Sequence, residues 1–199
     1  MGSLVLLRHG QTEWARDGRH TGRTDIALTE IGEQQARDAR EVLAAVLDGA
    51  PPVLTLTSPL VRAARTAELA GLQAEVEPRL MEWDYGGYEG LTSDQIREQA
   101  GPTWTVFEDG VVPGRTPGET LQQLAARLTE VVERVRPLLD DGDVVLVAHG
   151  HALRVLASCW LGADPRLGAQ LLLDPAGVCV LGHNHGAPAL QHWNLKGRG

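Results

Sequence analysis

Residues 4–10 read Leu-Val-Leu-Leu-Arg-His-Gly, an apolar run that ends in a cation, an imidazole and a glycine. Four apolar residues without a break are typical of a strand that is buried on both faces of a parallel sheet. Ligands of open α/β sheets bind just beyond the carboxyl ends of such strands, where Arg8 and His9 fall. An arginine fork suits a phosphate, a neutral histidine beside it can act as a nucleophile, and Gly10 would let the backbone approach a bound group. The stretch therefore indicates either an anion site or a strand end with chance polar residues.

Strand-like and helix-like segments alternate along most of the chain. This alternation predicts an α/β fold with three layers, α/β/α, in which helices cover both faces of a mainly parallel sheet. The pattern breaks down at about 83–117, where we expect a small irregular or helical cap. Strands are expected at 3–8, 53–58, 74–76, 143–148, 178–181 and 189–193, and helices from Thr29 to before Gly49, at 60–71, 93–100 and 118–139, and from 150 to about 161.

Length and composition limit the class of protein. A chain of 199 residues with 43% hydrophobic residues predicts a single domain over 1–199, with the cap as an insertion. The net charge of −8 disfavours nucleic acid as a partner. Because no apolar run approaches the about 18 residues that cross a bilayer, and no basic leader is seen, we expect a cytoplasmic protein without a membrane partner. A terminal edge strand near 178–182 could pair with a second copy and give a homodimer.

Three of the predicted strands end in polar groups of matching type. The first ends in Arg8 and His9, the second in Ser58 with Arg62 one helical turn later, and the third in His149 followed by a glycine. The carboxyl ends of parallel strands meet at one edge of the sheet, so these residues should converge. Two arginines and two histidines at one edge of an acidic protein predict an oxyanion pocket, to which the N-termini of the following helices would add their dipoles.

Longer blocks around these strand ends carry a more specific pattern. Taken together, and in the order in which they occur over residues 4 to about 160, these blocks resemble the signature of the histidine phosphatase superfamily, also called phosphoglycerate mutase-like. The string at 82–90, Glu-Trp-Asp-Tyr-Gly-Gly-Tyr-Glu-Gly, is similar to a phosphatase branch that contains acid phosphatases and a sugar bisphosphatase. The other blocks are Arg8-His9-Gly10-Gln11-Thr12-Glu13-Trp14, Thr21-Gly22, Leu28-Thr29-Glu30-Ile31-Gly32, Ser58-Pro59-Leu60-Val61-Arg62-Ala63 with Thr66, and Val147-Ala148-His149-Gly150.

The resemblance implies a role for each of these residues. His9 would attack phosphorus and carry the phosphoryl group, and nearby arginines would keep it unprotonated through like charge. Arg8, Arg62 and His149 would surround the non-bridging oxygens, so that no metal and no cofactor would be needed. The further residues implied to bind the substrate are Gln11, Thr12, Thr21, Gly22, Ser58 and Gly150.

The leaving oxygen needs a proton, and Glu82 occupies the position that resembles the proton donor of the family. The apolar neighbours Met81 and Trp83 would shield its carboxyl group, while Asp84 and Glu89 are rivals on sequence alone. Two residues depart from the pattern. Ala15 and His151 stand where members of the family commonly have asparagine, so hydrogen bonding around the phosphate should differ from that of a glycolytic mutase.

The resemblance leaves the reaction type open between a mutase and a phosphatase. The candidate lid at about 86–117 is short and has more acidic than basic residues, which favours access of water and hence hydrolysis. The chain is therefore expected to be a metal-independent phosphomonoester hydrolase that acts on a small phosphorylated metabolite, such as a sugar phosphate, through a phosphohistidine. The alternatives are a cofactor-dependent phosphoglycerate mutase and a catalytically silent phosphate-binding domain. A metallohydrolase using His149-Gly150-His151 or His183-Asn184-His185 is disfavoured, because neither pair has a carboxylate at ligand spacing.

Overall fold

The centre of the protein is one six-stranded sheet, seen in a computed structural model that describes residues 2–197. Its strands are β1 (Leu4–Arg8), β2 (Leu54–Thr57), β3 (Glu75–Val76), β4 (Val144–Ala148), β5 (Val178–Asn184) and β6 (Ala187–Leu195). They lie in the order β3-β2-β4-β1-β5-β6. The pairs β3–β2, β2–β4 and β4–β1 are parallel, whereas β5 is antiparallel to both of its neighbours. The expected mainly parallel sheet is thus confirmed.

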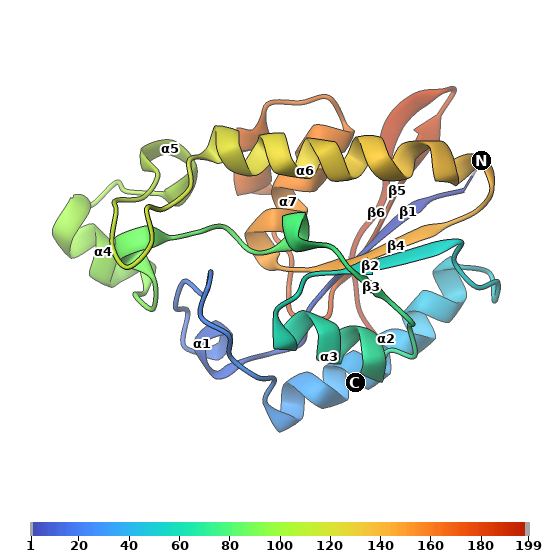
Figure 1. The fold of residues 1–199 in the computed structure, drawn as a ribbon, viewed down its shortest axis with the longest axis horizontal. Coiled ribbons are helices and arrows are strands. Elements are labelled where there is room, and N and C mark those ends of the chain that lie inside the picture. The colour runs from blue at the N-terminus through green and yellow to red at the C-terminus, as the bar shows by residue number, and fades with distance from the viewer. Residues whose placement is uncertain (1, 198–199) are drawn as a thin grey trace.

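Helices cover both faces of this sheet and complete three layers (Figure 1). One face packs against α2 (Glu30–Val46) and α3 (Val61–Leu69), and the other against α6 (Leu121–Val135) and α7 (Gly150–Trp160). Both layers are held by buried aliphatic side chains, which a chain poor in aromatic residues has to rely on. The short helices are α1 (Glu13–Arg16), α4 (Ser93–Ala100) and α5 (Val106–Asp109), and 3₁₀ turns occur at Pro78–Leu80, Gly86–Tyr88, Arg136–Asp140 and Pro165–Gln170.

Helix boundaries follow local signals in the sequence. The side chain of Thr29 accepts a hydrogen bond from the backbone of Gly32, which confirms it as the N-cap of α2. Capping boxes at Thr92 and Thr120 start α4 and α6 in the same way. The helix expected over 118–139 is shorter, because Pro137 cannot continue an α-helix and the chain tightens into a 3₁₀ turn after α6.

The terminal strands correct one expectation. Strand β5 lies between β1 and β6, so it is an interior strand and not the predicted free edge near 178–182. The cause is the turn at His185-Gly186, whose φ angles of 50° and 83° suit a two-residue hairpin and fold β6 back onto β5. The edge of the sheet is therefore β6, and pairing of two copies through 178–182 is wrong.

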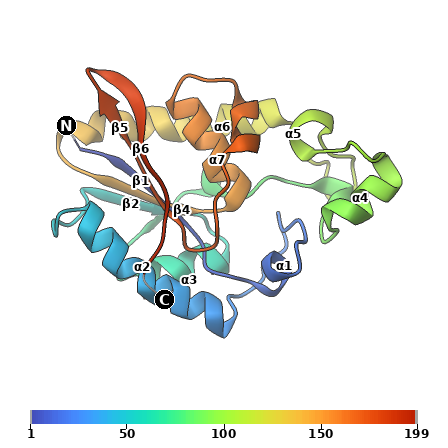
Figure 2. The same ribbon diagram turned by 180° about the vertical axis from the view of Figure 1, so that it is seen from behind.

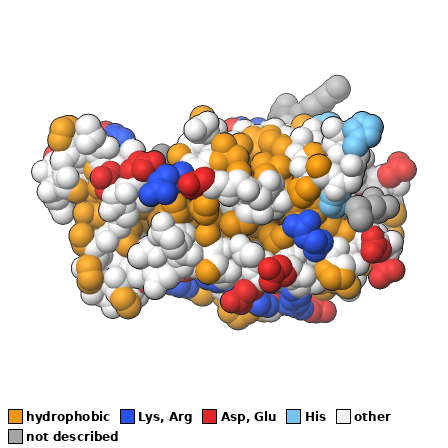
Figure 3. All heavy atoms as spheres, turned by 90° about the horizontal axis from the view of Figure 1, so that it is seen from above, with side chains coloured by type: hydrophobic (Ala, Val, Ile, Leu, Met, Phe, Trp, Pro, Cys, Tyr) orange, Lys and Arg blue, Asp and Glu red, His pale blue; other side chains and the backbone are white. Residues whose placement is uncertain are grey.

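The cap lies beyond the carboxyl ends of the parallel strands. Figure 2 shows α4 and α5 projecting on that side of the sheet, with α1 beneath them. On the face seen in Figure 3, acidic, basic and apolar side chains are interspersed, without a broad basic patch. Among residues 2–197, no helix combines the length and the apolar character that crossing a membrane requires.

Candidate active site

A cavity of about 190 Å³ opens where β1 and β4 end, beneath the cap. It brings together residues from the first strand end, the loop after α1, the start of the cap segment and the first turns of α7. Most of its lining can carry charge or donate hydrogen bonds. The polar and ionisable residues that line it are Arg8, His9, Arg19, His20, Thr21, Glu82, Tyr85, Ser93, His151 and Arg154, together with Gly150.

The imidazole of His9 is held so that one nitrogen is free to react. Its backbone N–H donates to the carbonyl of Ala148 at 2.9 Å, which extends the β1–β4 pairing by one residue. Nδ1 lies 2.7 Å from the carbonyl oxygen of Gly10, and because a carbonyl only accepts, Nδ1 carries the proton. Burial and the neighbouring cations Arg62 and Arg8 hold the pKa of His9 well below its usual 6.5. Nε2 therefore keeps its lone pair at neutral pH.

The absence of a side chain at Gly10 allows two backbone segments to pack closely, and Gly10 does not line the cavity. A side chain at this position would collide with the backbone carbonyl of Gly32 in the first turn of α2. The Gly10 amide donates to the hydroxyl of Thr66 on α3 at 3.1 Å. The residue that follows the nucleophile is thus fixed between two helices, which holds the end of β1 in place.

His149 and Arg62 form a buried support directly behind His9. The Nε–H of Arg62 donates to Nδ1 of His149 at 3.2 Å, so Nε2 of His149 carries the proton and donates to Ser58 at 2.7 Å. The rings of His9 and His149 are 5.1 Å apart. Burial, followed by the charge of Arg62, holds the pKa of His149 well below its usual range. Both nitrogens of His149 thus have protein partners, so its implied contact with phosphate would have to share one of them.

The remaining N–H groups of Arg62 largely hold the loop at 21–24. Nη1 donates to the carbonyl of Thr24 at 2.9 Å, and Nη2 donates to those of Thr21 and Gly22, both at 3.0 Å. Four of the five N–H groups are therefore occupied, which leaves one for a ligand. Arg62 is fully buried and is not part of the cavity lining.

Of the two arginines expected to bind phosphate, Arg8 is the one that lines the cavity. Its Nη1 donates to the carbonyl of Leu173 at 2.5 Å. Its Nε is buried and has no hydrogen-bond partner among residues 2–197, which is a costly arrangement for an N–H group. The guanidinium can give an oxygen of a bound phosphate a charge-assisted hydrogen bond from its cavity side.

Glu82 lines the cavity at the N-terminus of α7. Its Oε1 accepts from the amides of Trp83 at 2.9 Å and Ala152 at 2.8 Å, and its Oε2 accepts from the amide of His151 at 3.0 Å. The carboxylate thus occupies the amides that we expected to bind the substrate anion. The N-terminus of α3 is occupied in the same way, since the amide of Val61 donates to Asp25 at 2.8 Å.

The two rival carboxylates do not line the cavity. Asp84 accepts from the amide of Gly86 at 3.0 Å and from the hydroxyl of Thr116 at 2.5 Å, which ties the two ends of the cap together. Glu89 accepts from the amides of Gly22 and Thr24, at distances of 2.9 to 3.1 Å. Both act within the protein framework, and Glu82 is the carboxylate in reach of a substrate.

The six further residues expected to bind substrate divide into two groups. Thr21 and Gly150 line the cavity. The other four lie outside the lining and bond within the protein, and their contacts with substrate stay predictions. Gln11 accepts from Thr29, Thr12 caps α1, Gly22 bridges Arg62 and Glu89, and Ser58 holds His149.

Several residues of the lining were not among the expected site residues. The sequence marked His151 as a departure from the family pattern, and Arg154 lies three residues later on the same face of α7, a spacing that could have revealed it. Tyr85 belongs to the string at 82–90 but had no role of its own, and Arg19 and His20 gave no signal, because an irregular segment carries them. None of the acidic residues of the cap lines the cavity, and the expectation that the acidic lid favours access of water stays a prediction.

Comparison with known proteins agrees with this geometry. Residues 4–196 match the family model "Histidine phosphatase superfamily (branch 1)". An acid phosphatase of Mycobacterium tuberculosis is 37% identical over 98% of this chain and 93% of its own length. Sedoheptulose 1,7-bisphosphatase of Saccharomyces cerevisiae is 35% identical over 79% of this chain and 67% of its own. The solved structure of a Mycobacterium tuberculosis open reading frame superposes with a TM-score of 0.91, at 36% identity and 99% coverage of both chains. Relatives named as phosphoglycerate mutases share 30% to 38% of residues.

Proposed function

Because this chain belongs to the histidine phosphatase superfamily, we propose that it hydrolyses small phosphomonoesters through a phosphohistidine at Nε2 of His9, without a metal. The observation that carries the proposal is the state of His9. Its reactive nitrogen is unprotonated, lies in the cavity, and has the cations Arg8 and Arg62 beside it. The chain itself therefore supplies both the nucleophile and the positive charge that faces the phosphate.

The reaction proceeds in two displacements. In the first, the lone pair of Nε2 attacks phosphorus while the ester P–O bond breaks, and Glu82, which enters this step in its protonated form, gives its proton to the departing oxygen. In the second, water attacks the phosphohistidine, the N–P bond breaks, and Glu82 takes the proton of the water. Arg8, which lines the cavity, balances the charge of the phosphoryl oxygens in both steps, and the buried guanidinium of Arg62 adds its positive charge from behind His9.

Hydrolysis is favoured over phosphoryl transfer between positions of one substrate. Relatives that span nearly the whole chain include an acid phosphatase, and a sugar bisphosphatase is also among them. A mutase is the second candidate, because Arg19 and Arg154 bring further cations to the cavity and some relatives are named as mutases. A phosphoglycerate assay separates the two. Release of inorganic phosphate supports the phosphatase, and isomerisation with little free phosphate would support the mutase.

Trapping the intermediate tests the proposal directly. Brief incubation with a ³²P-labelled phosphomonoester in excess chelator should label the wild-type protein with acid-labile, alkali-stable phosphate. His9→Ala should show no label and should lose at least about a thousandfold in kcat. Activity that persists in this variant, or that the chelator abolishes in the wild type, would refute the mechanism. Absence of label and of turnover in the wild type would indicate a silent phosphate-binding domain.

We place the reaction in the cytoplasm, where small phosphorylated metabolites are found. In support, Cys159 and Cys179 are both unpaired thiols, as is usual in a reducing compartment.

A further inference from the structure

Two histidines that the proposed reaction does not use lie side by side in the cavity. The rings of His20 and His151 are nearly parallel, at an interplanar angle of 6° and a centroid separation of 6.1 Å. Backbone pairing with Gly90 and Leu91 fixes His20, since the His20 amide donates to Leu91 and the Gly90 amide donates to the His20 carbonyl. His151 is fixed by the first turn of α7. Both rings are therefore rigid parts of the wall that faces a bound substrate.

The free nitrogen of His20 is a hydrogen-bond acceptor. Its Nδ1 lies 3.0 Å from the carbonyl oxygen of Leu91, and because that oxygen can only accept, Nδ1 carries the proton. Burial lowers the pKa of His20 from its usual 6.5, so the ring is neutral at pH 7. A neutral imidazole has one N–H, so Nε2 of His20 bears a lone pair.

The free nitrogen of His151 is a hydrogen-bond donor. Its Nδ1 lies 2.6 Å from the hydroxyl of Tyr85. Burial, with the charge of Glu82, raises the pKa of Tyr85 well above its usual 10, so the hydroxyl keeps its proton. This hydroxyl has no other partner within residues 2–197, and we assign its proton to the contact with Nδ1, since a buried hydroxyl donates where an acceptor is in reach. Burial and Arg154 hold the pKa of His151 well below 6.5, so the ring is neutral and its proton sits on Nε2.

Both free nitrogens are within reach of a ligand. Within residues 2–197, the buried polar side-chain atoms that lack a partner are Nε of Arg8 and Nδ1 of His183. Nε2 of His20 and Nε2 of His151 also have no partner in that part of the chain, so both are accessible, and both residues line the cavity. The wall thus presents an acceptor next to a donor, both uncharged.

We propose that this acceptor–donor pair recognises neighbouring hydroxyl groups of the substrate, so that the preferred substrates are phosphate esters of polyols and sugars. One hydroxyl donates to Nε2 of His20, and another accepts from Nε2–H of His151. A second anionic group would face the lone pair of His20, although the cations Arg19 and Arg154 also line the cavity. Arg154 already donates Nε and Nη2 to the carbonyls of Gly168 and Ala169. This inference rests on the proposed phosphatase activity and names its substrate class.

A pair of esters of equal length tests the proposal. Glycerol 3-phosphate carries neighbouring hydroxyl groups on its two carbons that do not bear the phosphate, and n-propyl phosphate carries no hydroxyl group on its chain. In the wild type, kcat/KM for glycerol 3-phosphate should exceed that for n-propyl phosphate by about tenfold or more, since a site built for hydroxyl groups rejects analogues that lack them. His20→Phe and His151→Phe keep an aromatic ring and remove the nitrogens, and each should reduce the ratio to about threefold or less.

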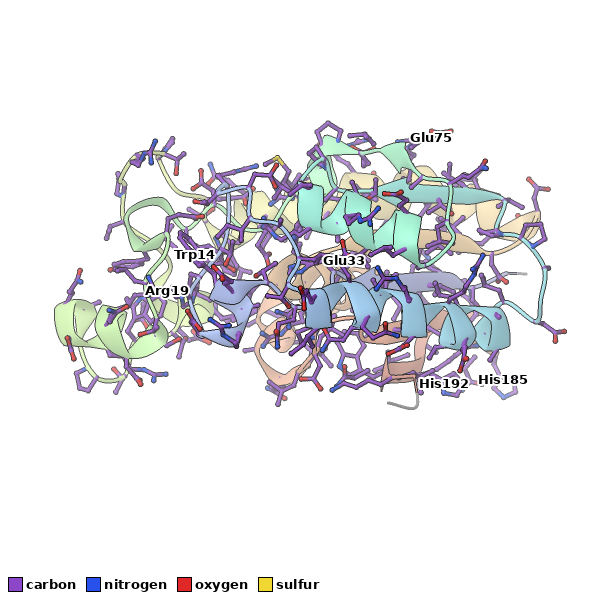
Figure 4. All side chains as sticks on the ribbon, turned by 90° about the horizontal axis from the view of Figure 1, so that it is seen from below. Trp14, Arg19, Glu33, Glu75, His185 and His192 are labelled. Atoms are coloured by element: carbon purple, nitrogen blue, oxygen red, sulfur yellow. The ribbon has the colours of Figure 1, made fainter. Side chains whose placement is uncertain are left out.

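A matched control is His192→Phe on β6. His192 is exposed, and Figure 4 shows it at the opposite end of the molecule from Arg19, which lines the cavity. This variant should keep the wild-type ratio. The ratio is measured within one preparation, so a partly inactive sample does not alter it. If His151→Phe fails to fold because Tyr85 loses its partner, the double variant Tyr85→Phe, His151→Phe removes the unpaired hydroxyl and carries the same expectation.

The outcomes separate this inference from the function on which it rests. A wild-type ratio near one, or an unchanged ratio in both single variants, would overturn hydroxyl recognition while His9-dependent turnover of n-propyl phosphate keeps the phosphatase proposal intact. Failure of the wild type to hydrolyse either ester, or p-nitrophenyl phosphate, would overturn both.

Discussion

At the scale of single residues, His9 depends on its surroundings for its protonation state. Burial, Arg62 and Arg8 all lower its pKa, and only the hydrogen bond to Gly10 opposes them. The cations that we propose to balance the charge of the phosphate thus also keep the proposed nucleophile unprotonated. Burial and these cations together lower the pKa of His9, and that pKa can be measured directly.

An NMR titration of the ring nitrogens of His9 should show a pKa below 6.5, so that the ring stays neutral as the pH falls from 8 to 6.5. Arg8→Gln removes one nearby cation and should raise this pKa toward the ordinary value. His192→Gln, which alters an exposed site, should leave the titration unchanged. A pKa at or above 6.5 in the wild type would contradict the assignment of His9 as the unprotonated nucleophile.

Glu82 should matter in proportion to the basicity of the leaving group. An alkoxide needs a proton as it departs, whereas p-nitrophenolate leaves without one. Glu82→Gln should therefore lower kcat for glycerol 3-phosphate by about a hundredfold or more, and that for p-nitrophenyl phosphate far less. Steady-state kinetics with both esters measures the difference. Equal losses on the two substrates would show that Glu82 positions α7 and His151 and does not donate the proton.

At the scale of elements, the sequence was informative where local chemistry decides the outcome. N-caps such as Thr29 and the three converging strand ends depend on neighbouring residues and on the direction of the sheet. The interior place of β5 was missed, because it depends on the hairpin that turns at His185-Gly186. The helix expected through residue 139 was too long, because Pro137 cannot donate a backbone hydrogen bond and the chain continues as a 3₁₀ turn.

In the candidate site, too, features set by the local sequence could be predicted, and features set by distant contacts could not. The place of Arg8 and His9 in the cavity could be predicted from the end of one strand. The hydrogen bonds that hold Arg62 could not be predicted, because its partners are the carbonyls of a loop about 40 residues earlier in the chain. His20 was missed for a similar reason, since only the backbone pairing with Leu91 and the rings around it bring it to the cavity.

At the scale of the whole molecule, one buried carboxylate links the edge of the sheet to the outer helix layer. Glu77 follows β3 and bonds with Arg79 and with Arg134 of α6, at distances of 2.5 to 2.8 Å. These partners lower the pKa of Glu77 from 4.5 to about 2. A carboxylate whose pKa is depressed by folding stabilises the folded state above its unfolded pKa, and that contribution is lost as the pH falls from about 4.5 toward 2.

Glu77→Gln should lower the free energy of unfolding by about 2 kcal/mol at pH 7, since charge-assisted hydrogen bonds are lost in a buried place. The difference from the wild type should be smaller at pH 3. Denaturant unfolding at both pH values gives the comparison. Glu75→Gln is the comparison on the surface, because the Glu75 side chain is 69% exposed (Figure 4) and its ion pair with Arg134, at 3.6 Å, should contribute little. Equal destabilisation by the two variants would argue that the bonds of Glu77 with Arg79 and Arg134 do not stabilise the fold.

The strand order also determines when each strand can pair with its neighbours during translation. Strand β1 is translated before the other strands of the sheet, yet its neighbours are β4 and β5, which begin at residues 144 and 178. A nascent chain on the ribosome therefore carries the apolar β1 with both edges unpaired until β4 and β5 have been made, a state in which chains aggregate or bind chaperones. His9 is thus synthesised long before His149 and the first turn of α7, which lie beside it. Chains terminated before α7 would accordingly contain His9 and remain inactive.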